Sequence, residues 1–423
     1  MKRFTFALLW LGLSLCAPVQ AATWTVQPGE SIQAAIERAA AGDTVRVARA
    51  RYEENLVITK PITLEGIDRP TVSGGLRGDT IRIRSPKVTI DGLIVINSGA
   101  DLEKQNAGIY LEPGSDSARV LNCDLVYNLF GLWIQTAKNV EIRDNLIAGK
   151  RDLISPRRGN GIQLYNSEGA QIIGNNISFV RDGIYVDVSH HAVFRNNRIH
   201  HVRYGTHYMN SHNNVWEGND SYYNRGGLAL MMARNQVVRN NRAWGNSDHG
   251  IMLRTLQDSV IEGNVVAGNA RGFFIYDAEY NVLRDNLVVD NTVGVHLWAG
   301  SYRNQAEGND FIANRTQIKY VAGRDEAWGV REGNYWSNYV GWDRNGDGIG
   351  DVPYAANDMV DYLSWRHPMM KLLLASPAVQ ALRLVAQQFP LLRAPSIVDP
   401  NPRMQPRHPD WSQWRGRYFP HPQ

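Results

Sequence analysis

The sequence predicts an all-β protein, a right-handed parallel β-helix whose coils are about 22 residues long. A glycine followed by alternating apolar residues recurs nine times, at intervals of 22 or 23 residues with one exception of 30. A period of this length, built from short strands, is typical of a solenoid in which each coil stacks on the next. The recurring glycines are Gly108, Gly131, Gly161, Gly183, Gly205, Gly227, Gly250, Gly272 and Gly294.

Asparagine gives a second regular signal. It stands 14 residues after each of the first eight glycines and 15 residues after the ninth. Asparagine tolerates a left-handed backbone conformation, and its amide can bond to the asparagine one coil away, so we expect a stacked ladder. A leucine-rich repeat has a similar period, but the leucine ladder it needs is absent. The expected ladder is Asn122, Asn145, Asn175, Asn197, Asn219, Asn241, Asn264, Asn286 and Asn309.

Composition narrows the function classes. Of the 423 residues, 43% are hydrophobic and 20% are charged, which excludes disorder for most of the chain. Lys and Arg number 45 against 41 Asp and Glu, with no basic block, so we expect no nucleic-acid partner. The two cysteines, Cys16 and Cys123, exclude a disulfide scaffold and a cysteine-ligated zinc site.

The N-terminus predicts export. Residues 1–21 combine Lys2 and Arg3 with the apolar stretch Phe4–Leu15 and a small-residue cleavage site at Ala21. A membrane anchor is the alternative, but the apolar stretch is too short to span a bilayer. We therefore expect a signal peptide and a periplasmic mature protein.

The solenoid needs a cover at each end. Residues 22–100 are expected to form the N-terminal cap and first coils, with a helix over Ser31–Ala40 that begins at Ser31 as N-cap. Residues 101–325 form the repeats, interrupted by a loop near Lys150–Arg158. Residues 326–365, rich in Trp and Tyr, form a C-terminal cap with an Asp-rich loop. Residues 366–423 are expected to form one or two amphipathic helices and a Pro-rich tail.

The repeat also assigns side chains to faces. The first and third residues after each glycine are usually aliphatic and should fill the interior, so the second and fourth residues should face outward. Two outward columns therefore run along the stack. Around His207 and Met209 they carry sulfur, imidazole and aromatic side chains, which is unusual for a face that should be polar.

These columns predict a copper site. Adjacent coils are about 4.8 Å apart, so Met209 and Met231 should be direct neighbours, with Met252 diagonally beyond them. Thioethers bind soft Cu⁺ and, unlike thiols, cannot be lost to disulfides in an oxidising compartment. We predict a copper site at His207, Met209, Met231 and Met252, with Met232 as a flanking residue. A protein-docking surface rich in methionine is the alternative, and both interpretations can hold together.

The Asp-rich loop predicts a second metal site. Asp343, Asn345, Asp347, Ile349 and Asp351 match the first nine positions of an EF-hand loop, so calcium is a candidate ligand. Tyr354 stands at the twelfth position, where a bidentate Glu belongs. An Asx-rich turn without an ion is the alternative.

An enzyme remains an open alternative. Many parallel β-helices cleave or epimerise acidic polysaccharides, and this chemistry needs carboxylates or a His/Arg/Tyr set beside a carboxylate. The outward columns offer only Glu112 and Asp187 as acids. Asp187, His207 and Arg254 are close enough in the repeat to keep a uronate lyase or C5-epimerase under consideration.

The C-terminal part of the chain resembles the NosD family. The resemblance is carried by Gly333–Tyr339 (GNYWSNY), by the acidic loop Asp343–Asp351 with the following Val352-Pro353-Tyr354, and by the apolar run from His367. It extends over essentially the whole mature chain. It implies a periplasmic, non-enzymatic protein that delivers Cu⁺ to apo-nitrous oxide reductase during assembly of the copper–sulfide centre. The family supplies no ligand motif that can be transferred, so the copper ligands rest on the face argument.

The resemblance also implies partners. Members of this family work with an ABC transporter, which has a membrane subunit and a cytoplasmic ATPase, and with a copper-carrying lipoprotein. We expect the C-terminal amphipathic helices to dock on the membrane subunit, unless they pack as part of the cap. The docking residues would be Met369, Met370, Leu372, Leu373, Leu382, Leu384 and Phe389.

Overall fold

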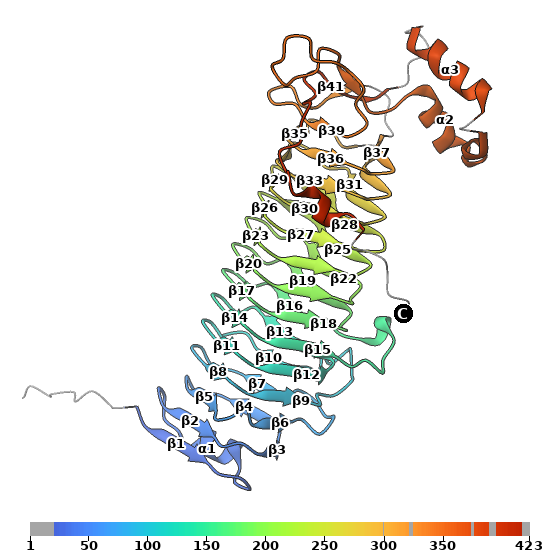
Figure 1. Ribbon diagram of the computed structural model, residues 1–423. Coiled ribbons are helices and arrows are strands. Elements are labelled where there is room, and N and C mark those ends of the chain that lie inside the picture. The colour runs from blue at the N-terminus through green and yellow to red at the C-terminus, as the bar shows by residue number, and fades with distance from the viewer. Residues whose placement is uncertain (1–20, 299, 321–324, 374–375, 389–394, 417–423) are drawn as a thin grey trace, which may run out of the picture.

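A computed structural model describes residues 21–298, 300–320, 325–373, 376–388 and 395–416 (Figure 1). It confirms the parallel β-helix: the described chain winds through about 14 coils, and three long parallel sheets run along the stack. In each sheet a strand pairs with the equivalent strand of the next coil, so neighbours in space are about 22 residues apart in sequence. Residues 1–20 lie outside the described part, and so does most of the expected signal peptide. No helix in the described ranges is long and apolar enough to cross a membrane.

The first sheet contains 13 strands among the described residues. In spatial order they are β1 (Thr23–Val26), β2 (Thr44–Val47), β5 (Thr63–Gly66), β8 (Thr89–Asp91), β11 (Arg119–Leu121), β14 (Glu141–Arg143), β17 (Gln171–Ile173), β20 (Val193–Arg195), β23 (Val215–Glu217), β26 (Val237–Arg239), β29 (Val260–Glu262), β32 (Val282–Arg284) and β35 (Gln305–Glu307).

The second sheet contains 12 described strands and carries the predicted metal residues. They are β4 (Leu56–Ile58), β7 (Ile81–Ile83), β10 (Ala107–Leu111), β13 (Phe130–Gln135), β16 (Ile162–Tyr165), β19 (Asp182–Asp187), β22 (Tyr204–Met209), β25 (Gly226–Arg234), β28 (His249–Gln257), β31 (Arg271–Tyr276), β34 (Val293–Leu297) and β37 (Thr316–Tyr320).

The third sheet again contains 13 described strands. They are β3 (Arg51–Glu53), β6 (Thr71–Ser73), β9 (Ile94–Ile96), β12 (Asp124–Asn128), β15 (Leu146–Gly149), β18 (Asn176–Ser178), β21 (Arg198–His200), β24 (Asp220–Tyr222), β27 (Arg242–Trp244), β30 (Val265–Ala267), β33 (Leu287–Val289), β36 (Asp310–Ile312) and β39 (Tyr335–Trp336).

The recurring glycines of the second sheet lie against side chains of the third sheet and against the backbone of the next coil. A Cβ atom at Gly183 would lie 2.3 Å from the Cγ2 atom of Ile199 and 2.5 Å from the carbonyl oxygen of Gly205. Gly131 and Gly161 meet the next glycine carbonyl at 2.5 and 2.6 Å in the same way. Real Cβ contacts are not this short, and the backbone carbonyl cannot turn away. The glycine column is therefore a steric requirement of the coil stack.

The asparagine ladder is confirmed from Asn145 onward. Each buried Asn donates its side-chain amide to the side-chain oxygen of the next, at about 2.9–3.0 Å, for example Asn175 to Asn197. Two details differ from the prediction. Asn122 is an exposed residue one position out of register, and the backbone amide of Cys123 occupies the ladder position instead. From Asn145 to Asn309 the left-handed residue is the one before the ladder asparagine, and this residue is Gly, Asn or Asp with φ of 52–69°. The ladder is Asn145, Asn175, Asn197, Asn219, Asn241, Asn264, Asn286, Asn309 and Asn334.

The expected N-terminal cap helix is present. Helix α1 (Ile32–Arg38) begins at Ser31, whose hydroxyl accepts a hydrogen bond from the Ala34 amide at 3.1 Å. Its apolar face, formed by Ile32, Ala35 and Ile36, is buried in the same core as the coil interior. The helix therefore shields the first coil from water.

The 30-residue coil contains the expected loop. It includes a single 3-10 turn, η1 (Ser155–Arg157), and folds back over the stack. The Lys150 ammonium is buried, donates to the carbonyl oxygen of Ser98 at 2.8 Å and lies 4.8 Å from the Tyr127 ring centroid. Burial lowers the pKa of Lys150. These contacts fix the loop on the outside of the solenoid.

Aromatic side chains close the other end. Trp336 stacks on Phe311 at 4.3 Å and on Tyr354 at 4.4 Å, and Trp328 joins the same core. Beyond this cap the chain forms helix α2 (Met359–Arg366), the 3-10 helix η2 (Pro368–Leu373) and helix α3 (Pro377–Gln388). Figure 1 shows α2 and α3 projecting sideways from the end of the stack. The first of these helices starts before the expected region and carries a capping box between Asp358 and Asp361.

The Pro-rich tail packs against the cap and the coils. Its strand β41 (Ile397–Asp399) lies between β38 (Glu326–Ala327) and β40 (Tyr354–Ala355) in a small fourth sheet. The tail then turns back along the third sheet, where η4 (Trp411–Trp414) packs near β33 (Figure 1). Trp411 and Trp414 pack against an apolar cluster of that sheet. The tail is thus part of the fold, because these aromatic rings find apolar surface on the coils.

Asp399 ties the tail to the cap and should be essential for its stability. Its buried carboxylate accepts hydrogen bonds from the amide and side chain of Asn334 at 2.9 and 3.0 Å and from the Trp336 indole at 2.9 Å. Asp399→Ala leaves these donors buried without partners, so we expect a loss of about 2–3 kcal/mol. Urea unfolding followed by tryptophan fluorescence measures it. Asp410→Ala, on the exposed part of the tail, is the control and should change little. Equal stability of both variants would contradict this role of Asp399.

Candidate metal-binding site

The strand register brings the outward columns together as predicted. His207 pairs with Ala229, and Ala229 pairs with Met252. Tyr208 pairs with Leu230, so the residues that follow them, Met209 and Met231, stand on adjacent strands. Three consecutive coils, β22, β25 and β28, therefore present the predicted side chains on one outer face of the second sheet.

The thioethers form a cluster of their own, separate from the core inside the coils. Ala229, Met231 and Met252 are its buried members, and Tyr204, Met209 and Phe274 pack against them. Met231 is 8% exposed and Met252 is 7% exposed. The prediction that this face is open to solvent is therefore wrong in part: the sulfur atoms lie outside the core but are covered by one another and by aromatic rings.

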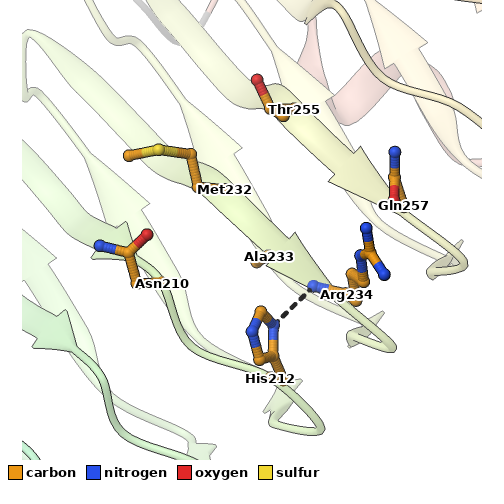
Figure 2. A pocket seen from close by; sticks show the side chains of 7 residues that line it. All are labelled: Asn210, His212, Met232, Ala233, Arg234, Thr255 and Gln257. Atoms are coloured by element: carbon orange, nitrogen blue, oxygen red, sulfur yellow. Dashed lines mark hydrogen bonds between the residues drawn. The ribbon is translucent and has the colours of Figure 1, made fainter.

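Met232 lies away from this cluster. It stands within β25 with φ of 49°, is 41% exposed and does not belong to the methionine cluster. It lines a surface hollow of about 310 Å³ together with His212 and Arg234. Figure 2 shows how these side chains lie and marks the hydrogen bond that the Arg234 amide donates to the His212 Nδ1 atom. The hollow is lined by Asn210, His212, Met232, Ala233, Arg234, Thr255 and Gln257.

A buried carboxylate orients His207. The Nδ1 atom of His207 lies 3.0 Å from an oxygen of Asp182, which is fully buried. A carboxylate can only accept, so this contact places the proton on Nδ1 and leaves the Nε2 lone pair available. Arg203 binds both oxygens of Asp182 at 2.8 and 2.6 Å and balances its charge. The 3.2 Å approach of Arg203 to the same Nδ1 atom is then a contact and not a hydrogen bond.

The pKa of Asp182 has two opposing influences. Burial raises it, but the hydrogen bonds from His207 and Arg203 and the Arg203 charge outweigh burial, so the pKa lies below its ordinary value. Asp182 is therefore a carboxylate at neutral pH. This state is the one that holds the Nδ1 proton of His207.

Two tyrosines enclose the imidazole. The Tyr185 ring meets the His207 ring edge-on at 4.6 Å, and the Tyr204 ring does so at 5.4 Å. The Tyr185 hydroxyl donates to the sulfur of Met209 at 3.5 Å. Burial raises the pKa of Tyr185, so the hydroxyl keeps its proton. Tyr185 thus links the imidazole and the thioether.

The chemistry of this set suits a soft ion. The proposed ligand atoms are one imidazole nitrogen and three thioether sulfurs, and none of them is a hard oxygen ligand of the kind that calcium or magnesium needs. Within the described ranges no group of three or more His, Cys, Asp or Glu side chains could hold a metal ion. A site on this face therefore has to depend on methionine.

Sequence reasoning missed Asp182, Arg203, Tyr185 and Tyr204 as partners of the site. Asp182 and Tyr204 each stand directly before a repeat glycine and pair with each other across adjacent strands. The prediction of faces used only the residues after each glycine, so it did not include the position just before the glycine. Reading it would have placed a carboxylate beside His207.

The Asp-rich loop is closed by its own hydrogen bonds. The carboxylate of Asp343 accepts from the amides of Gly346 and Gly348 at 2.7 and 2.8 Å, and the side chains of Asn345 and Asp347 accept amides two residues ahead. Asp351 accepts from the Arg344 amide at 2.8 Å, and Ile349 is partly exposed. These bonds are those of an Asx-rich turn, and calcium binding here stays a prediction.

The expected docking residues lie on the C-terminal helices. Met369 is 74% exposed, Leu373 is half exposed, and Met370 is partly buried. Leu372 belongs to η2, and Leu382 and Leu384 belong to α3, but their side chains lie outside the described part, as does Phe389 altogether. The described helices therefore present apolar surface, while four of the seven predicted side chains are not described.

The residues of the enzyme alternative have different neighbours. Asp187 accepts from the Asn210 amide at 3.4 Å, Arg254 lies over the Tyr276 ring at 5.9 Å, and Glu112 pairs with Arg82 and Arg84. The carboxylate beside His207 is Asp182. The acid–base set that the sequence suggested is thus replaced by a more deeply buried one.

Comparison with known proteins assigns the family. A model described as "Periplasmic copper-binding protein (NosD)" matches residues 143–341, and a model of a protein of unknown function (DUF1565) matches residues 21–221. A Pseudomonas aeruginosa protein named "Probable ABC transporter binding protein NosD" is 37% identical over 373 residues, which cover 85% of this chain and 87% of the relative. The chain belongs to the NosD family. A relative of the same name from Stutzerimonas stutzeri is 33% identical over 414 residues, which cover 94% and 92% of the two chains.

A solved structure supports the fold of this NosD-family member. The A-module of the Azotobacter vinelandii mannuronan C-5 epimerase AlgE6 aligns with a TM-score of 0.57 over 69% of this chain and 91% of that chain. The two are 18% identical. At this identity the likeness concerns the β-helix alone.

Proposed function

We propose that this protein is a periplasmic copper-transfer scaffold that works with an ABC transporter and passes Cu⁺ to apo-nitrous oxide reductase during assembly of its copper–sulfide centre. The observation that carries the proposal is the methionine cluster on the outer face of the second sheet, next to a histidine whose Nε2 lone pair is freed by Asp182. The proposed ligands are His207, Met209, Met231 and Met252. The copper-binding description of the family model supports the choice of ion.

The site suits transfer better than storage. Thioethers are weak, exchangeable ligands for Cu⁺, and they bind little of the hard ions. Met231 and Met252 are almost covered by neighbours, so the ion would be shielded from water. A flexible methionine can still swing outward to hand over an ion, because its side chain has three rotatable bonds. Met232 is exposed, lies outside the methionine cluster and is not part of the proposed site.

The transporter partner is proposed from the relatives and from the C-terminal helices. Both relatives are named as ABC transporter binding proteins. Helices α2 and α3 stand away from the stack, and Met369, Leu373 and Val385 are exposed on this part. Apolar side chains on a projecting segment are suited to docking on a membrane subunit. A copper-carrying lipoprotein as donor is part of the same proposal.

Metal titration of the purified mature protein tests the proposal. Cu⁺ under anaerobic conditions should be taken up in competition with a Cu⁺ chelator, whereas Ca²⁺ and Mg²⁺ should not compete for it. Uptake by apo-nitrous oxide reductase from the loaded protein, in the presence of the transporter, tests the transfer step. Absence of Cu⁺ binding both alone and with the transporter would overturn the proposal.

A polysaccharide-active enzyme is the second candidate. It is favoured by the buried Asp182 beside His207, with Arg203 and Tyr185 in contact, since such a set can transfer protons. Turnover of alginate or pectin that is lost in Asp182→Asn would support it. We place it second because Tyr185 and His207 adjoin a closed methionine cluster, where a sugar has little to bind.

A further inference from the structure

His249 has an unusual environment on the same face. It is the first residue of β28, its side chain is 1% exposed, and neither ring nitrogen has a hydrogen-bond partner among the described residues. The nearest carboxylate oxygen, on Asp248, lies 3.7 Å from Nδ1, which is too far for a hydrogen bond, and Arg271 already binds that carboxylate. Buried polar atoms without partners are rare in folded proteins and call for a reason.

The fold makes room for this ring. His249 pairs with Gly226 on the adjacent strand, and a Cβ atom at Gly226 would lie 2.5 Å from the Nε2 atom of His249. The imidazole therefore leans over β25, toward the Tyr204 ring at 5.5 Å. Tyr204 also packs against the methionine cluster. His249 and the sulfur atoms thus adjoin the same tyrosine.

The small residues continue beneath the cluster. Ala229 follows Gly226 on β25 and pairs with Met252, which lies three residues after His249 on β28. These two small residues of β25 therefore separate larger side chains on the two adjacent strands. Tyr204 and His207 stand on β22, and His249 and Met252 stand on β28. The His249 imidazole and the Met252 thioether both extend from β28, and they can approach each other above these two small residues.

Three partly buried histidines of neighbouring coils each use a ring nitrogen in a hydrogen bond. The His212 Nδ1 atom accepts a backbone amide, as does that of His190, so their protons lie on Nε2. His207 uses Nδ1 with Asp182. Burial lowers the pKa of His249, which keeps the ring neutral, the form that ligates metals.

We propose that His249 is a second nitrogen ligand on this face and holds a soft monovalent ion, Cu⁺, together with Met252. This inference rests on the proposed copper function and adds to it. It gives one of the two unpaired nitrogens a partner and explains the glycine opposite the ring. His249 stands on β28, the same strand as Met252, so the site keeps to the same three coils.

His249→Gln tests the inference, with Cu⁺ itself as the probe. We expect Cu⁺ affinity, measured by chelator competition on the full mature chain, to fall by on the order of tenfold or more, since even outer-shell partners of metal ligands contribute that much. X-ray absorption of the Cu⁺-loaded protein should show weaker imidazole scattering in this variant, with the contribution of His207 remaining. His296→Gln is the matched control, because His296 is also buried with an unpaired Nε2 but lies beyond Phe274, outside the cluster. The His296→Gln variant should bind Cu⁺ as tightly as the unmodified protein does.

Gly226→Ala gives an independent test that keeps the histidine. Its new methyl group would push the ring away from the cluster and should weaken Cu⁺ binding to a similar extent. If the unmodified protein binds Cu⁺ and both variants bind it equally well, with unchanged imidazole scattering, the role of His249 is refuted while the copper function stands. If the unmodified protein binds no Cu⁺, the copper function itself fails.

Discussion

Replacing Met209, Met231 and Met252 together by leucine is expected to lower Cu⁺ affinity by about 100-fold or more, because leucine removes the soft sulfur donors. The fold should survive, since Leu and Met have similar volumes and such exchanges usually cost less than about 1.5 kcal/mol each. The three side chains pack in a separate outer cluster, so the core inside the coils is untouched. Chelator competition measures the affinity, and far-UV circular dichroism checks the fold.

A matched triple variant controls for the loss of methionine as such. Met369, Met370 and Met404 lie on the C-terminal helices and the tail, away from the second sheet. Their replacement by leucine should leave Cu⁺ binding unchanged. A cluster variant that retained full affinity would show that the ligands lie elsewhere, even though the family assignment would remain.

The second large effect is expected for Asp182→Asn. The substitution keeps the shape but removes the charge that holds Arg203 and His207 in place. Removing one partner of a buried ion pair typically costs about 3–5 kcal/mol, and Asp182 is fully buried. Because the Nδ1 proton of His207 also loses its charged acceptor, Cu⁺ affinity should fall by about 10–100-fold. Urea unfolding and chelator competition measure the two effects separately.

The Asp182 carboxylate makes the stability of the folded protein depend on pH. The pKa of Asp182 is lower in the folded protein than its ordinary value of about 3.9, so the folded state favours the carboxylate. Its contribution to stability is therefore complete above about pH 4 and is lost as the pH falls through the lowered pKa. The stability difference between the unmodified protein and Asp182→Asn should be constant near neutral pH and shrink in acid below pH 4. A difference that grew in acid would contradict this sign.

Arg203 offers a way to separate stability from metal binding. Arg203→Lys keeps a positive charge near Asp182 but loses the two-pronged contact at 2.8 and 2.6 Å. It leaves the Asp182–His207 hydrogen bond in place. We therefore expect lower stability with little change in Cu⁺ affinity. Equal losses of affinity in Arg203→Lys and Asp182→Asn would mean that the orientation of His207 is not what matters.

Much of the fold followed from the sequence because a solenoid repeats its own rules. The glycine column could be read from its spacing, and the structure shows that a Cβ atom at Gly183 has no space. The N-cap at Ser31 and the pairing of Met209 beside Met231 were also correct in register, since strand alternation and the repeat period fix both. Local periodicity was sufficient wherever each coil contacts only its neighbours.

The exceptions depend on contacts between distant segments. The tail from Ile397 reads as Pro-rich and irregular, and its place on the third sheet follows from Asp399 meeting Asn334 and from Trp411 meeting the coils. Asn122 has the expected spacing but lies one position out of the ladder. No local pattern reports such contacts.

The sequence by itself determined the coil, the family resemblance and which residues share the outer face, because each depends on identity and spacing. Only the tertiary structure decided how the face works: Asp182 orients His207, aromatic rings close over the thioethers, and His249 lies over Gly226 without a partner. These features arise from side-chain packing across coils, where burial and the removal of water set the energies.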